Sequence, residues 1–185
     1  MVSTSGSSGM AGTGSVVIAI AAYRHRTAEG MAQVGPGQRA GAVAIGVIRT
    51  PPSSLIHERL AEIHGEMESL LSQFKPDAVA IEQVFFQNNV RTAMGVGQAS
   101  GIVLALASRA GCAVAQYTPS QVKNTIVGWG SATKDQIGHM VQQRLNLATI
   151  PQPADAADAA AIALCHCSIA PFIASRDAAI ARSAR

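Results

Sequence analysis

The sequence lacks the features that mark disulfide-bonded, secreted and membrane-spanning proteins. Its three cysteines show neither CxxC spacing nor a disulfide framework, which favours buried free thiols in a reducing compartment. No segment reaches the roughly 18–20 uninterrupted apolar residues of a transmembrane helix. The N-terminus has no basic residue before its first apolar run, so it does not resemble a secretory signal. We therefore expect a cytoplasmic protein that needs no membrane.

Charge and length set broad limits on the protein's class. A net charge of +3 and a pI near 9.0 are a weak indication of nucleic-acid binding. The 185 residues suit one compact domain, and we find neither internal repeats nor a long linker. We expect a flexible Ser/Gly/Thr-rich tail over residues 1–14, a domain over 15–170 and a loosely ordered tail over 171–185.

Short apolar runs alternate with amphipathic stretches along the chain. The expected strands are Ser15–Ala22, Gly41–Ile48, Ala78–Ile81 and Ala113–Tyr117. The expected helices are Ile56–Phe74, Val90–Ala110, two that begin after Thr118 and Thr133, and one from near Pro153 to about Ile169. This order predicts an α/β domain of three layers.

Glu82 is the first residue that could carry chemistry. It ends a short apolar strand, and strand ends form the rim where α/β proteins place functional groups. A strand-end carboxylate that merely faces water explains the same position.

Asp155 and Asp158 form a second acidic feature. They lie three residues apart at a helix start, so both project from one face. Two acids that favour the helix dipole explain this pattern. However, only alanines surround the pair, and close acids in an apolar setting also suit a magnesium ion. His166 lies eleven residues beyond Asp155, about 16 Å along a continuous helix, and cannot share that ion.

Several other side chains suit DNA contact. Phe85 and Phe86 follow Glu82 closely and could stack on exposed bases, although at least one is expected to pack inward. Lys123 and Lys134 lie near helix N-termini, where phosphates bind favourably.

Gly97 and Gly101 share one face of the Ala/Gly-rich helix. Their spacing indicates either tight packing on the sheet or a dimer interface.

Taken together, three segments resemble the RuvC family of Holliday-junction resolvases. They are DAVAIEQVFFQNNVRTAMGVGQASG from Asp77, TPSQVKNTIVGWGSATKDQIGHMV from Thr118 and PQPADAADAAAIALCHC from Pro151, preceded by Arg49-Thr50-Pro51. The resemblance covers about two-thirds of the chain. It implies an RNase H-like domain, with a mixed central sheet and helices on both faces.

The resemblance also implies an activity and the residues that perform it. The activity is a magnesium-dependent endonuclease that resolves Holliday junctions by paired symmetric nicks, with two Mg²⁺ ions per site and Mn²⁺ as a substitute. Its implied partners are four-way junction DNA, a second copy in a homodimer and the RuvA–RuvB branch-migration complex. The resemblance implies catalytic and metal-binding roles for Glu82, Asp155 and Asp158, base stacking for Phe85, and DNA contact for Lys123 and Lys134. Phe86 and Arg91 are further candidates for DNA binding because they follow Glu82 closely in the chain.

One residue of the family pattern is absent. The family has an aspartate at the end of its first strand, in an IDPG context, whereas this chain reads AAYRHR after Ile20 and has no aspartate before Asp77. Glu29 is the only acid before Glu58 and has no matching context. Either residues 21–40 carry a local shift of reading frame, which resequencing would test, or the chain binds junctions with little or no cleavage.

Overall fold

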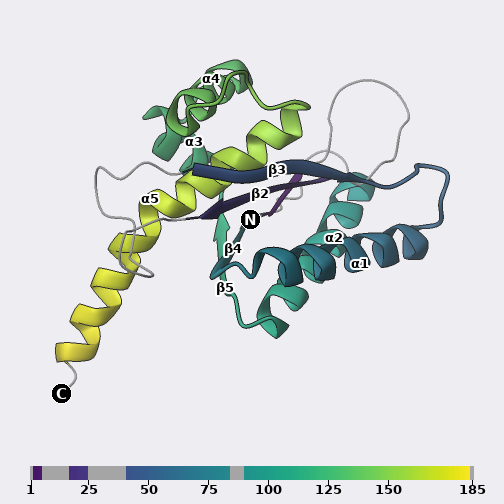
Figure 1. The fold of residues 1–185 in the computed structure, drawn as a ribbon, viewed down its shortest axis with the longest axis horizontal. Helices are drawn as coiled ribbons and strands as arrows, with labels where there is room; N and C mark the ends of the chain where they lie inside the picture. The colour runs from purple at the N-terminus through teal and green to yellow at the C-terminus, as the bar shows by residue number, and fades with distance from the viewer. Residues whose placement is uncertain (1, 6–16, 25–40, 84–89, 184–185) are drawn as a thin grey trace.

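A computed structural model describes residues 2–5, 17–24, 41–83 and 90–183, with side chains described for 41–83, 94–176 and 179–183. The elements are β1 (Val2–Ser5), β2 (Val17–Arg24), β3 (Gly41–Arg49), α1 (Ile56–Phe74), β4 (Ala78–Glu82), α2 (Val90–Arg109), β5 (Ala113–Tyr117), α3 (Pro119–Val127), α4 (Lys134–Leu145) and α5 (Ala154–Ser183). Strands lie between helical layers, as the sequence predicts (Figure 1).

The strands form two hydrogen-bonded sheets, one of three strands and one of two. β2 pairs antiparallel with both β1 and β3, while β4 and β5 pair in parallel. β1 also lies against β4, so the two ladders adjoin at these two strands. Parallel pairing aligns the ends of β4 and β5 and places Glu82 opposite Tyr117.

Two expectations about the chain ends are wrong. Val2–Ser5, which we expected to lie in a flexible tail, is a strand of the sheet, so the apolar run at residues 17–24 forms the second strand and not the first. At the other end, α5 continues to Ser183 instead of ending near Ile169, and residues 171–183 are helical. Pairing partners far along the chain decide the first case, and alanine-rich composition with high helix propensity explains the second.

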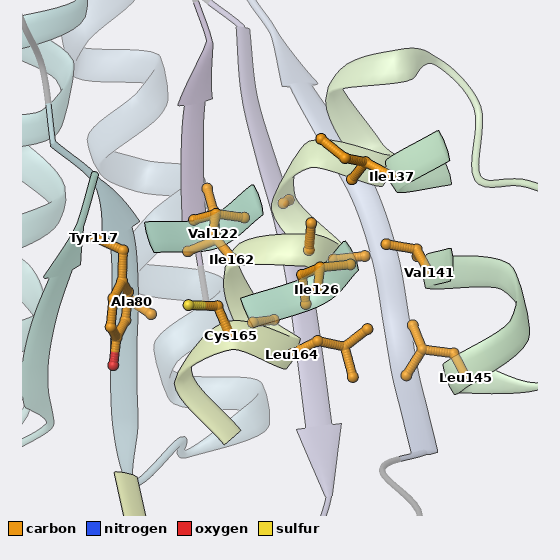
Figure 2. Packing of buried hydrophobic residues seen from close by; sticks show 14 of the residues in the cluster. Ala80, Tyr117, Val122, Ile126, Ile137, Val141, Leu145, Ile162, Leu164 and Cys165 are labelled. Atoms are coloured by element: carbon orange, nitrogen blue, oxygen red, sulfur yellow. The ribbon is translucent and has the colours of Figure 1, made fainter. Parts of the chain in front are cut away.

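The two faces of the sheet carry separate cores. Val79 and Ile81 of β4 pack with α1 and α2, whereas Ala80 and Tyr117 pack with α3, α4 and α5. Figure 2 shows this second core, with Ile162 and Cys165 of α5 near Ala80 and Tyr117. Because side chains alternate along a strand, Glu82 lies on the same face as Ala80, the face that α5 covers.

Helix α5 is the central element of the second core. By length and composition it could span a membrane, but half of its apolar window is buried inside the protein, as in the core helix of a folded domain. Its buried positions include Ala159, Ala160 and Ala163, whose small side chains let the helix approach the sheet closely. The first turns of α5 therefore lie against the layer that carries Glu82.

Candidate active site

Glu82 ends β4 on the face that α5 covers, and its side chain is half-buried. Burial and the negative charge of Asp158 raise the pKa of Glu82 to about 7, against the opposing effect of Lys134 and Lys123. A carboxyl group with this pKa lies in an apolar, negatively charged setting. The half-buried position of Glu82 argues against a fully solvated strand-end acid.

Asp158 joins Glu82 from the second turn of α5. Burial raises the pKa of Asp158, and Asp155 adds to this rise, while the charge and hydrogen bond of Lys134 oppose it. Asp155 is half-buried one turn earlier on the same helix. Glu82 and Asp158 come from elements more than 70 residues apart, and the fold brings their charges together.

Two lysines border this acidic site. The ammonium of Lys134 donates a hydrogen bond to Oδ2 of Asp158 at 3.2 Å, and Lys123 acts on both acids through its charge. Each lysine belongs to a short helix whose start is fixed by a capping box, with Thr118 and Gln121 in α3 and Thr133 and Gln136 in α4. The sequence predicts both helix starts, and the structure confirms them.

The described acids fit a divalent cation of the magnesium class. Such ions bind through one or two carboxylates and complete their shells with water and substrate phosphate. Glu82 and Asp158 would offer hard oxygen ligands at a place where burial and neighbouring negative charge raise the pKa of Glu82. Within residues that the structure describes, no three His, Cys, Asp or Glu side chains converge into a complete ligand set. The acids thus offer a partial shell that leaves room for a phosphate.

The predicted DNA-contacting residues divide by location. Lys123 and Lys134 lie beside the acids. Phe85 and Phe86 fall outside the described residues, and Arg91 lies in α2 with an undescribed side chain. Their roles stay predictions.

Tyr117 and His166 form a contact that the sequence does not predict. The Tyr117 hydroxyl and Nδ1 of His166 lie 2.8 Å apart and share a hydrogen bond. Burial lowers the pKa of His166, and it raises the pKa of Tyr117 to about 12. This contact agrees with the interpretation of His166 as a core or surface histidine. The only signal for this contact in the sequence is that both side chains are rings with a polar atom.

The strand order changes where the aspartate that the family has at the end of its first strand would be expected in this chain. Because β1 lies against both β2 and β4, the strand next to the one that carries Glu82 is Val2–Ser5 and not the run that contains Ile20. Residues 6–16 fall outside the described residues, and their sequence contains neither Asp nor Glu. Ala21–Arg24 pair with β3, so this part of the 21–40 segment behaves as ordinary strand.

Comparison with known proteins gives one consistent answer. A family profile described as "Crossover junction endodeoxyribonuclease RuvC" matches residues 18–166. A relative of that name from Parafrankia sp. (strain EAN1pec) is 46% identical over 150 residues, covering 81% of this chain and 84% of the relative. Another from Rhodococcus opacus (strain B4) is 48% identical over 144 residues, covering 78% and 76%.

Solved structures agree with the sequence comparisons. The structure of Thermus thermophilus RuvC is similar with a TM-score of 0.73 and 32% identity, covering 92% of this chain and 93% of that chain. T. thermophilus RuvC in complex with a Holliday junction substrate is similar with a TM-score of 0.71 and 30% identity, covering 92% of each. The expected RNase H-like fold is confirmed. The chain therefore belongs to the RuvC family of crossover junction endodeoxyribonucleases.

Proposed function

We propose that this chain is a magnesium-dependent endonuclease that resolves four-way DNA junctions by paired symmetric nicks. The observation that carries the proposal is the joining of Glu82 and Asp158 in one half-buried acidic site, bordered by Lys123 and Lys134. The family supports it, as does the similarity to T. thermophilus RuvC in complex with a Holliday junction substrate.

Each side chain has a distinct task in this proposal. Glu82, Asp155 and Asp158 would hold the divalent ion, which when bound supplies Lewis-acid stabilisation of charge on the phosphodiester. Lys123 and Lys134 would bind backbone phosphates and position the strand against the acids. Phe85 and Phe86 would stack on bases at the branch point, and Arg91 would contact the backbone. Two Mg²⁺ ions per site, with Mn²⁺ as a substitute, stay predictions.

The partners follow from the same proposal. A two-fold dimer would place two acidic sites against two strands of a two-fold junction. Gly97 and Gly101 of α2 support a packing role in that dimer, because a Cβ at either glycine would meet no described atom within 4 Å. Packing against the residues that the structure describes therefore does not account for the two glycines. We expect a cytoplasmic protein that meets the RuvA–RuvB complex on DNA.

A junction-binding protein with little or no cleavage is the second candidate. The observation that favours it is the absence of any acid before Glu29, which includes the segment after β1. Loss of a central ligand would weaken metal binding while leaving the lysines and the DNA surface in place.

Cleavage of a synthetic four-way junction with Mg²⁺ tests the proposal, with Glu82→Gln as a control. Symmetric nicks that disappear in the control would establish the resolvase. Tight junction binding without nicks would favour the second candidate. Branched DNA bound no better than duplex would contradict both.

A further inference from the structure

Lys134 contacts the site's acid directly. Its Nζ lies 3.2 Å from Oδ2 of Asp158, as both a hydrogen bond and an ion pair. The Lys134 side chain is 70% exposed, whereas that of Asp158 is 24% exposed. The ammonium therefore reaches into the site from solvent, on a stem that is free to move out.

A divalent ion bound at Asp158 would need an oxygen that Lys134 contacts. A cation bound at Asp158 would use the carboxylate oxygens and would repel a neighbouring ammonium. The start of α4 is fixed by the Thr133–Gln136 capping box, so only the lysine side chain has to move. Once displaced, the ammonium lies at a helix start beside the path that a phosphate would take.

We propose that Lys134 competes with the divalent metal ion for Asp158, so that metal loading releases its ammonium to a DNA phosphate. This inference rests on the proposed function, because it needs a metal at the acids and DNA at the lysines. Since coupling between two ligands is reciprocal, the metal would strengthen DNA binding and DNA would strengthen metal binding through this one side chain.

Lys123 supplies an internal contrast. It acts on Glu82 and Asp158 through its charge, and the ion pairs recorded among the described residues do not include it. Lys123 is thus available to a phosphate with or without metal. Lys75, at the end of α1 and before β4, is a lysine at the opposite end of the strand from Glu82.

The first experiment is calorimetric titration of Ca²⁺, an oxygen-seeking probe, into the full chain without DNA. We expect Lys134→Met to bind Ca²⁺ about two- to fivefold more tightly than wild type, as suits the loss of an exposed ion pair. Lys123→Met should gain less Ca²⁺ affinity, and Lys75→Met should bind Ca²⁺ as tightly as wild type. Equal gains in Lys134→Met and Lys123→Met would overturn the proposal.

The second experiment measures the salt dependence of four-way junction binding, with and without Ca²⁺. Each phosphate contact contributes about 0.9 to the logarithmic salt slope. The salt slope of Lys134→Met should therefore differ from that of wild type by about 0.9 with Ca²⁺ and by about zero without it. The salt slope of Lys123→Met should differ from that of wild type by a similar amount with and without Ca²⁺.

Two outcomes separate the possible failures. A slope difference for Lys134→Met that is the same with and without Ca²⁺ would overturn the inference while leaving the proposed function intact. Absence of Ca²⁺ binding in every variant would overturn the metal-dependent function, and the inference with it.

Discussion

The two faces of the sheet each carry a cationic side chain, but with opposite surroundings. On the face covered by α1 and α2, Arg59 is 7% exposed and its Nε donates to Oγ1 of Thr50 at 3.0 Å. Its Nη2 is buried and has no hydrogen-bond partner among the residues that the structure describes. On the face covered by α5, Lys134 is mostly exposed and pairs with a half-buried acid.

The first face contributes to the stability of the fold, whereas the second face carries the candidate site. Arg59 is buried on the same helix as Ile63, and its long apolar stem can pack in the interior. On the other face the acids are partly buried, which shifts their pKa values. The acids and lysines there are also partly exposed, so a ligand can reach them. We expect substitutions on the first face to change stability and those on the second to change cleavage.

The largest effect should come from Asp158→Asn. Loss of a ligand charge should lower the junction-nicking rate by at least roughly 10²–10³-fold, the range seen when a key electrostatic group is removed. Asp77→Asn, exposed at the other end of β4, is the matched control and should nick normally. Equal rates for both variants in a gel assay would remove Asp158 from the site.

Arg59→Ala should reduce stability and leave Ca²⁺ binding unchanged. Truncation leaves a cavity beside the α1 core, and we expect a loss of about 2–4 kcal/mol in free energy of unfolding. Arg59→Met should recover most of this loss, since it keeps the stem and removes the unpartnered donor.

Urea unfolding of both Arg59 variants gives the measurement, with the exposed Arg109→Ala at the end of α2 as control. A large change in Ca²⁺ affinity for Arg59→Ala would break the separation of the two faces.

The pH dependence of stability should report Glu82. Its pKa in the folded protein, about 7, lies above its ordinary value of 4.5, so the fold favours the protonated form. The contribution is fully present below about pH 4.5 and is lost as pH rises through about 7.

We expect this loss to be about 1–3 kcal/mol without metal, after allowance for solvent screening. Glu82→Gln should remove it from a pH series of unfolding curves. An unchanged pH profile in the variant would show that another group titrates there.

The smallest effect should come from Tyr117→Phe. The variant loses one hydrogen bond to His166 and keeps the ring packing, so we expect about 1 kcal/mol of destabilisation in thermal unfolding. His166→Ala in the same assay should lose more, because it also removes ring contact. A drop in nicking larger than this stability loss predicts would place the pair closer to the chemistry.

Local patterns predict most of the architecture. The helical spacing of Ile56–Phe74 and the capping boxes at Thr118 and Thr133 define α1, α3 and α4 within a few residues. The site acids can also be named from sequence, Glu82 by the strand that it ends and Asp158 by its helix start. The DNA-binding roles of Phe85, Phe86 and Arg91 rest on their position after Glu82 and, for Phe85, on the family resemblance.

The prediction of the strands fails where pairing between residues far apart in the chain determines which segment becomes a strand. Val2–Ser5 is short and polar, so only its position between β2 and β4 makes it a strand. The sequence pattern consequently places the first strand at Ser15–Ala22 and the missing carboxylate just beyond it. The extension of α5 past Pro171 also went unpredicted, because a proline usually marks a helix end.

The sequence alone determined the family, the alternation of strands and helices, and the acids available for catalysis, because these depend on residue type and local spacing. Tertiary structure decided which strand lies at the centre of the sheet, that Glu82 and Asp158 share one face, and that Lys134 contacts the acid. Such contacts join residues far apart in the chain, and their free energy depends on burial and geometry that exist only once the layers have packed.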